Sequence, residues 1–482
     1  MLFNSFDFCF IFFPLVTALY FLLPQRFRWA MLLAASCWFY MAFVPVYILI
    51  LGFTIAVDYA AGILIERSQG SVRKRWLIAS IVANVGVLAF FKYFNFLNQS
   101  IAALVQGMGI AYTVPDLGIL LPIGLSFHTF QSLSYTIEVY RGHQKAERRP
   151  GIFALYVMFY PQLVAGPIER PGNLLRQLNE RHVWDHARVV HGLQQMLWGF
   201  FKKLVIADRC AVIVDQVYGD PSAYDGLGTL LATYLFALQI YCDFSGYTDI
   251  ALGAARVMGF DLMVNFRTPY RSASISEFWS RWHISLSSWF RDYVYIPLGG
   301  NRVVRWRWFM NLMIVFLLSG LWHGANWTYV AWGGLHGLYL VLAIVVAGAM
   351  VWFDGITGLV RQPRLRRALA ILVTLHLVVF GWVFFRADNF AEAGEVITSW
   401  TRIDGSMRGL IALAREIGAG IVATTLAFAL VFIALDPWAD AIAKGERSIA
   451  WRPARFAYFG ALLAACLIFG NYGAAMFIYF QF

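Results

Sequence analysis

Long, nearly uncharged apolar stretches recur from one end of this chain to the other. Of its 482 residues, 60% are hydrophobic and 17% are aromatic, whereas only 13% are charged. A helix needs about 20 apolar residues to cross a bilayer, and several of these stretches reach that length. Only helices and closed barrels satisfy the backbone in lipid, and these runs are continuous rather than alternating. The sequence therefore predicts an all-α polytopic integral membrane protein.

The candidate membrane segments share length and low charge. They are Phe8–Leu23, Trp29–Phe43, Val46–Ile65, Trp76–Leu97, Leu117–Tyr140, Gly151–Pro167, Val189–Ile206, Leu227–Gly259, Trp308–Leu321, Trp327–Met350, Ala368–Phe385, Ile417–Leu435 and Phe456–Phe480. Some are short enough to be re-entrant, which leaves about eleven true crossings. Asp354–Arg367 and Ala387–Arg415 are expected to be extramembrane connections. Because no internal repeat or linker is visible, we expect a single membrane-embedded domain over residues 1–482.

Basic residues follow the first, third and fifth segments, while the loops between them carry almost no charge. These clusters are Arg26 and Arg28, then Arg67 with Arg73–Arg75, then Arg141–Arg149. The positive-inside rule puts all three in the cytoplasm and the N-terminus in the periplasm of a bacterial inner membrane. Gly151–Pro167 lies between basic residues and contains two prolines. It is either a dip that returns to the cytoplasmic side or an ordinary crossing.

The net charge of +11 arises from these short loops and not from a basic soluble domain, so nucleic acid is not an expected partner. The five cysteines are scattered, and no His, Asp, Glu or Cys cluster has metal-ligand spacing. We therefore expect neither a disulfide framework nor a metal site. The expected partner along most of the chain is the lipid bilayer itself.

Two tryptophan–histidine pairs stand out in this apolar chain, Trp282-His283 and Trp322-His323. An imidazole is costly in lipid unless it faces a cavity or a polar partner, so an intramembrane histidine indicates a functional site. Histidine also transfers protons near neutral pH. The pairs therefore predict chemistry inside the membrane, with both histidines as candidate catalytic residues and both tryptophans as candidate substrate contacts.

His283 belongs to Ser274–Tyr293, in which apolar residues recur at helical spacing. Ser274 and Glu277 form a capping-box pattern, and Glu277 and Arg281 stand in the favourable order for an ion pair. We expect one amphipathic helix at the membrane boundary, with His283 at the border of its two faces. A structural interfacial histidine is the alternative explanation.

His323 follows a purely apolar run and is bracketed by Gly320 and Gly324. These glycines let backbone or substrate approach closely. Ser319 and Asn326 could orient its imidazole or bind an oxyanion. Because a new apolar stretch follows directly, Gly320–Asn326 is predicted to be a helix break near membrane depth. The alternative is a structural histidine that bonds a backbone carbonyl.

Other polar residues have simpler explanations. Three histidines in apolar segments are expected to hydrogen-bond between helices, and four near basic loops are expected to be solvated: His128, His336 and His376, then His143, His182, His186 and His191. Asp243 and Asp249 could be catalytic or bind a cation. Pairing with an arginine such as Arg256 or Arg267 is the favoured interpretation, because a buried charge usually has a partner.

Several motifs occur in a consistent order over most of the chain. They are Met1–Ser5, Leu121–Phe127, Ala165–Ile168, Asp243–Tyr247, Glu277–Ser287, Arg291–Tyr293, Leu298–Arg302 and Gly320–Ala325. This set resembles the membrane-bound O-acyltransferase (MBOAT) family, and within it the bacterial alginate O-acetyltransferase subgroup, which is related to the teichoic acid D-alanyl transfer proteins. The resemblance implies an acyltransferase with its catalytic motifs between residues 241 and 336. Its expected fold surrounds a central funnel or tunnel with transmembrane, re-entrant and interfacial helices.

The resemblance also assigns roles. His323 matches the family's catalytic histidine and His283 its second histidine, whereas His128 departs from the subgroup's pattern. It implies an acyl donor on the cytoplasmic side, acetyl-CoA or another acyl thioester carrier, and no tightly bound cofactor. Arg281, Arg291 and Arg302 are expected to meet the donor's phosphates. The implied acceptor is an extracytoplasmic polysaccharide such as alginate or cellulose, reached with a periplasmic acetyltransferase-like partner.

Two other classes of protein compete with this interpretation. A proton-coupled transporter or flippase would use the intramembrane Asp and His residues as a relay, although many transporters show internal symmetry that is not evident in this sequence. A non-catalytic scaffold of a polysaccharide export complex would not need His323 for polymer acetylation.

Overall fold

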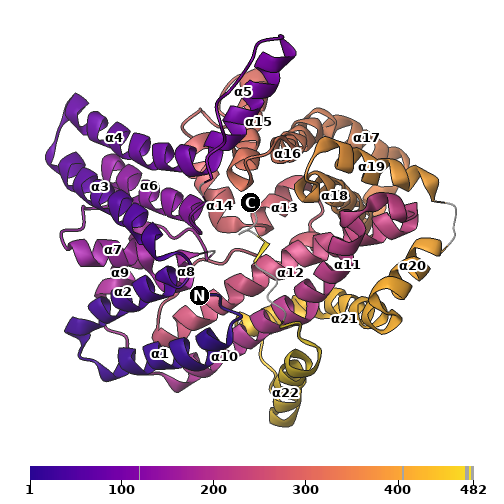
Figure 1. The fold of residues 1–482 in the computed structure, drawn as a ribbon. Coiled ribbons are helices and arrows are strands. Elements are labelled where there is room, and N and C mark those ends of the chain that lie inside the picture. Colours follow the sequence, from indigo (N-terminus) through magenta and orange to yellow (C-terminus); the bar gives the residue numbers. More distant parts are fainter. Residues whose placement is uncertain (119, 165, 404–406, 473–476, 479–482) are drawn as a thin grey trace. The chain divides into compact units, whose positions relative to one another are not determined.

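The computed structural model describes residues 1–118, 120–164, 166–403, 407–472 and 477–478. Within these ranges every regular element is a helix (Figure 1). Among the described residues, seven helical segments are long and apolar enough to cross a membrane: Pro45–Arg67, Gly70–Gly107, Gly226–Met258, Trp327–Val345, Pro363–Arg386, Ala419–Ala443 and Arg452–Phe469. The predicted all-helical membrane protein is confirmed, whereas the count of about eleven crossings stays a prediction.

The contacts group the chain into two compact units. Unit 1 comprises Met1–Met196 with Thr248–Met263, and unit 2 comprises Leu197–Tyr247 with Val264–Phe482. Two helices contribute residues to both units, α10 (His186–Phe200) and α12 (Gly226–Met258). The single membrane-embedded domain over residues 1–482 stays a prediction.

Unit 1 contains the first nine α-helices. They are α1 (Phe13–Leu22), α2 (Gln25–Met41), α3 (Ile48–Arg67), α4 (Gly70–Leu88), α5 (Phe94–Gly107), α6 (Leu125–Arg141), α7 (Pro150–Met158), α8 (Tyr160–Leu163) and α9 (Pro171–Asn179). A buried polar contact joins α3 to α4, where the Ser80 hydroxyl and the Asn84 amide donate to Asp58 at 2.6 Å and 2.9 Å. Because the donors satisfy the carboxylate, its burial is tolerated inside an apolar bundle.

Two predicted segments of unit 1 are interrupted. Helix α6 begins at Leu125 and not near Leu117, because Gly124 caps it with a φ of 76°, a conformation that favours glycine. The Gly151–Pro167 stretch breaks after Met158, where Phe159 leaves the helical region with ψ of 112° and α8 begins. A continuous crossing is therefore absent over its described residues; Ala165 lies outside them. The predicted return to the cytoplasmic side stays a prediction.

Unit 2 contains the remaining helices. They are a π-helical turn (Phe201–Ala207), α11 (Asp208–Gly219), α13 (Ile275–Arg281), α14 (Ile284–Phe290), α15 (Arg305–His323), α16 (Trp327–Val345), α17 (Ala347–Ile356), α18 (Pro363–Arg386), α19 (Phe390–Ser399), α20 (Arg408–Ile417), α21 (Ala419–Ala443) and α22 (Arg452–Phe469). The predicted Phe456–Phe480 segment is helical to Phe469; residues 473–476 and 479–480 lie outside the described ranges.

Helices α15 and α16 form a tight hairpin around the predicted break (Figure 1). A Cβ on Gly320 would collide with the Tyr329 carbonyl oxygen, and one on Gly333 would collide with the Phe316 carbonyl oxygen. These glycines therefore let the two backbones touch, as small residues do between membrane helices. The hairpin fixes the end of α15, which is where His323 stands.

The prediction of one helix over Ser274–Tyr293 is wrong, because the chain turns between α13 and α14. His283 adopts φ 43° and ψ 54°, a left-handed conformation that is costly for a residue with a Cβ. Asn265 stabilises the turn: its carbonyl accepts from Ile284 N at 3.0 Å, and its side chain accepts from Ser285 N at 3.2 Å. The start of α13 is as predicted, since the Ser274 side chain accepts from Glu277 N.

Candidate active site

The two predicted histidines meet although they come from different helices. His283 precedes α14 and His323 ends α15, and their ring centroids lie 6.2 Å apart. His283 is 0% and His323 is 2% exposed. Burial lowers the pKa of the His283 imidazole to about 3, because a charged ring would lose its hydration there. This ring is therefore neutral at physiological pH.

Aromatic side chains enclose the pair. Phe244 of α12 lies 4.7 Å from His283, while Trp332 of α16 and Phe385 of α18 lie 5.0 Å and 5.5 Å from His323. Trp322 contacts both imidazoles, with centroids 5.8 Å from His283 and 4.9 Å from His323. The result is a site with little room for bulk water, in which electrostatic interactions are strong.

Two indole N–H groups in this region are buried without a hydrogen-bond acceptor among the described residues. They belong to Trp282, which was predicted as a substrate contact, and to Trp332, which was not. Both side chains are 0% exposed. A buried donor without an acceptor is costly, so each can gain by meeting a carbonyl or oxyanion of a ligand. Nothing in the sequence around Trp332 distinguishes it from the other aromatic residues of that helix.

An apolar cavity of about 750 Å³ reaches the helix that ends in His323. Residues of α13, α14, α15 and α16 line it, and Ser319, one turn before His323, is among them. Trp308 and Leu312 line its part near the start of α15, and Arg291 also lines it. This volume falls in the range of about 300–1,000 Å³ that small-molecule sites occupy.

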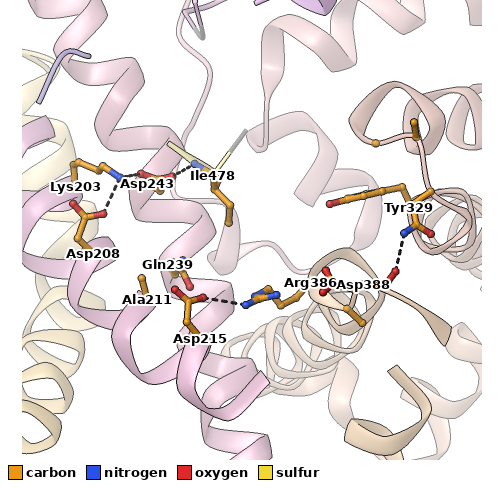
Figure 2. A pocket seen from close by; sticks show the side chains of 14 residues that line it. Lys203, Asp208, Ala211, Asp215, Gln239, Asp243, Tyr329, Arg386, Asp388 and Ile478 are labelled. Atoms are coloured by element: carbon orange, nitrogen blue, oxygen red, sulfur yellow. Dashed lines mark hydrogen bonds and ion pairs between the residues drawn. The ribbon is translucent and has the colours of Figure 1, made fainter. Parts of the chain in front are cut away.

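A second cavity, of about 360 Å³, begins on the other side of His323. Gly324 and Asn326, which follow that histidine, line it together with residues of α11, α12 and α18. Its lining is polar and charged, and Figure 2 shows the Arg386 side chain reaching Asp215, with which it pairs at 3.0 Å. Both cavities therefore reach residues close to His323 in the chain, but the lining of one is apolar and that of the other is polar.

One wall of this polar cavity holds a buried charge cluster. Lys203 lies between two carboxylates, 2.7 Å from Asp208 and 2.6 Å from Asp243, and Figure 2 shows both ion pairs. The three side chains are 5% exposed or less. Asp243 also accepts from Ile478 N at 2.7 Å. Pairing was the favoured prediction for Asp243 and is confirmed, but its partner is a lysine and not an arginine.

Two acceptor atoms remain for a ligand in this cavity. Asp208 Oδ2 and Gln239 Oε1 are buried and have no hydrogen-bond donor among the described residues. Both residues line the cavity. Sequence reasoning missed Lys203, Asp208 and Gln239. For Lys203 and Asp208 the sequence did contain a signal, because both are charged and only apolar residues separate them.

Three other residues predicted to bind substrate or donor each have a partner within the protein, namely Asn326, Arg281 and Arg291. Asn326 caps α16 by accepting from Thr328 N at 3.1 Å, and its amide donates to Asp388 O at 2.7 Å. Arg281 pairs with Glu277 at 2.6 Å as expected, and it lines neither cavity. Arg291 pairs with Asp292 at 2.8 Å. The structure thus gathers the Trp–His pairs, and of these two arginines only Arg291 lines the apolar cavity.

The single histidines follow the prediction only in part, since His182 and His191, which were expected to be solvated, are half-buried and contact Gln177 O and the Arg256 guanidinium. His336 accepts from Trp279 Nε1 at 3.2 Å and His128 Nε2 contacts Leu163 O at 2.7 Å, both between helices. His376 is exposed and bonds Leu372 O within its own helix, so the interhelical bond predicted for it is wrong. Asp249 accepts from Gln195 Nε2 at 3.0 Å.

Sequence comparisons with known proteins identify the family to which the chain belongs. A sequence model of the membrane-bound O-acyltransferase family matches residues 151–354, which include both histidines. The chain is 41% identical over 399 residues to the probable alginate O-acetylase AlgI of Pseudomonas aeruginosa, covering 82% of this chain and 73% of that protein. The corresponding protein of Azotobacter vinelandii is 40% identical over 420 residues, which cover 84% of this chain and 80% of the relative.

A third relative is named for a different polymer. The peptidoglycan O-acetyltransferase of Helicobacter pylori is 32% identical over 437 residues, which cover 84% of this chain and 80% of that protein. These similarities extend over most of each chain, well beyond the two histidine motifs. The protein is an acyltransferase that belongs to the membrane-bound O-acyltransferase family.

Proposed function

We propose that the protein moves an acetyl group from a cytoplasmic thioester donor across the bacterial inner membrane, for O-acetylation of an extracytoplasmic polysaccharide such as alginate or cellulose. The observation that carries the proposal is the meeting of His283 and His323 in a buried aromatic site, with a different cavity on each side of His323. The relatives named as alginate and peptidoglycan acetylating proteins support both the acetyl group and a polymer acceptor.

The apolar cavity is the proposed donor side. It lies toward the start of α15, and that start carries Arg302, Arg305 and Arg307, so the positive-inside rule assigns it to the cytoplasm. The start of α18 is also basic, with Arg364, Arg366 and Arg367. Apolar walls suit an acyl thioester arm, and the basic rim suits the phosphates of acetyl-CoA or of a carrier protein's arm. The N-terminus is then periplasmic.

The polar cavity is the proposed acceptor side. The end of α15 and the end of α18 line it, so it opens toward the face opposite the basic clusters. Asp208 Oδ2 and Gln239 Oε1 offer unpaired acceptors to a hydroxyl group. Its volume of about 360 Å³ suits one sugar unit or one side chain better than a polymer. The proposal therefore includes a periplasmic acetyltransferase-like partner that passes the acetyl group onward.

His323 is the proposed general base. It takes the proton of an acceptor hydroxyl as the oxygen bonds to the thioester carbonyl carbon; the carbon–sulfur bond then breaks, and the proton passes to the leaving thiolate. The indole N–H groups of Trp282 and Trp332 support this chemistry as donors toward the developing oxyanion. A neutral His283 beside His323 orients or polarises the donor carbonyl.

Cells that carry His323→Ala provide the test, with polymer acetyl content measured at matched membrane abundance. His376→Ala is the control, because His376 is exposed and bonds only a carbonyl of its own helix among the contacts described. The account predicts that His323→Ala abolishes acetylation and that the control retains it. Retained acetylation in His323→Ala would instead favour a scaffold. If neither variant accumulated in the membrane, the assignment of His323 as general base would lose its support.

A further inference from the structure

Unit 1 contains a cavity that the transfer reaction does not use. It has a volume of about 270 Å³, and Arg26, Arg28 and Arg149 line it together with the aromatic rings of Tyr20 and Trp29. We propose that this cavity binds a phosphate group of an anionic ligand at the cytoplasmic face of the membrane. The proposal is independent of the acyltransferase site and of the function proposed for it.

The cavity carries a surplus of positive charge. Among the residues that the structure describes, neither Arg26 nor Arg28 has a carboxylate within ion-pair distance. Arg28 instead donates to carbonyl oxygens, Leu23 O at 3.0 Å and His182 O at 2.6 Å. These bonds hold the guanidinium in position but leave its charge uncompensated. An anion would therefore gain from both cations at once.

The remaining charges on the cavity wall are nearly balanced. Arg149 lies 3.4 Å from Glu147 with 59% of its side chain exposed, so this pair is loose and open to exchange. Glu180, which also lines the cavity, lies 3.7 Å from Arg176. The net lining stays positive because the Arg26 and Arg28 charges have no counterpart.

Two of the three helix ends at the cavity favour an anion, whereas the third, the end of α9, carries a partial negative charge. The cavity lies where α2 and α7 begin, since α2 starts at Gln25 and α7 follows Arg149. Helix N-termini carry a partial positive charge that favours anions. Gly151 lets these two starts approach, because a Cβ there would collide with the Trp29 ring. The arginines and the helix starts therefore act on the same small volume.

Size and position narrow the ligand to a phosphate group. At about 270 Å³ the cavity is smaller than the roughly 300 Å³ at which sites for drug-sized ligands begin, so a whole nucleotide cofactor does not fit. Arginine forks match phosphate oxygens in pairs. The positive-inside rule puts this basic cluster at the cytoplasmic leaflet, where anionic lipids attract Lys and Arg. The phosphate could belong to a lipid headgroup or to a soluble phosphate.

The test measures the melting temperature of the purified full chain during titration with phosphatidylglycerol, phosphatidylcholine or inorganic phosphate. The cavity variant is Arg26→Gln with Arg149→Gln. Its control is Arg67→Gln with Arg75→Gln, which removes the same charge from exposed cytoplasmic positions outside the cavity. Arg28 is kept, because its bonds to two carbonyls give it a structural role.

We expect phosphatidylglycerol, but not phosphatidylcholine, to raise the melting temperature of wild type and control. The half-saturating concentration should be about 100-fold higher in the cavity variant, since it loses two charge-assisted hydrogen bonds and each is worth about tenfold. If inorganic phosphate acts in the same way, the ligand is a soluble phosphate; if it does not, the ligand is a lipid headgroup. An equal response of the cavity variant and the control to every additive would overturn the proposal, as would an equal effect of the two lipids.

Discussion

The imidazole rings of His283 and His323 lie 6.2 Å apart, at an angle of 57°, although one stands at a break between two short helices and the other at the end of a long one. Neither helix alone could create this pair. The α15–α16 hairpin holds His323, and Asn265 holds the turn at His283. The relationship therefore depends on close backbone contacts and on one strained residue.

The α15–α16 contact predicts opposite effects at two adjacent glycines. Gly333→Ala should cost about 1–3 kcal/mol, because its methyl group would collide with the Phe316 carbonyl of α15. Gly334→Ala should be neutral or slightly stabilising, since its methyl would meet only the flexible Leu317 side chain, at 3.4 Å, and alanine favours helix. Melting temperatures of the two variants at one scan rate measure this difference. Equal melting temperatures would contradict the hairpin geometry.

Replacing Lys203 should destabilise the protein more than replacing either of the two aspartates that it pairs with. Lys203→Met leaves two buried carboxylates without their shared cation and should cost about 3–5 kcal/mol. Asp243→Asn leaves Lys203 paired with Asp208, so it should cost far less. If Lys203→Met does not accumulate, adding Asp208→Asn and Asp243→Asn should restore folded protein. Denaturation of the purified variants checks the order, and a Lys203→Met protein as stable as wild type would refute it.

His283 predicts a loss of stability in acid. Its pKa is lowered from an ordinary 6.5 to about 3 by burial, so the unfolded chain takes up a proton at a higher pH than the folded one. This contribution is complete above about pH 6.5 and falls steadily as the pH drops toward 3. His283→Gln should therefore flatten the decline in melting temperature between about pH 8 and pH 5.

A control histidine isolates that effect. The matched control is His186→Gln, which should leave the wild-type pH dependence almost unchanged because His186 is exposed and lies outside the buried site. A His283→Gln protein whose melting temperature falls as steeply as that of wild type would mean that the His283 ring is not kept neutral by burial.

The polar cavity predicts a change in acceptor use. Gln239→Met keeps the side-chain volume but removes an unpaired acceptor atom, so the acceptor KM should rise about tenfold. Hydrolysis of the donor in the absence of acceptor should keep its rate, because the proposed donor route is the apolar cavity. Gln216→Met is the control, since Gln216 is exposed on the same helix as Asp208 and lines no part of the cavity. A rise in KM for the control as large as that for Gln239→Met would argue against the cavity.

Local signals in the sequence predicted the ends of helices only in part. Ser274 starts α13 by capping, as predicted, because its side chain acts on its own neighbouring backbone, whereas α15 continues through Gly320, where the break was predicted to begin, and ends at His323. The Trp–His motifs also singled out two histidines whose rings lie close together in the structure. The catalytic roles of these histidines stay predictions.

Relationships over long distances could not be predicted in the same way. The left-handed turn at His283 has no marker in the sequence, since glycine or asparagine is the usual residue there, and it depends on Asn265 from another segment. The choice of Lys203 as partner of Asp243 likewise depends on how α12 packs against the π-helical turn. Periodicity cannot reveal either, because it describes one helix at a time.

Single-turnover transfer in sealed proteoliposomes tests the central claim most directly. The thioester donor is supplied on the cytoplasmic face and a hydroxyl acceptor on the opposite face, with wild type, His323→Ala and His376→Ala at equal density. The account predicts that His323→Ala loses at least about 100-fold in transfer rate while keeping its melting temperature, and that His376→Ala matches wild type. Transfer by a folded His323→Ala protein at the wild-type rate would contradict the account.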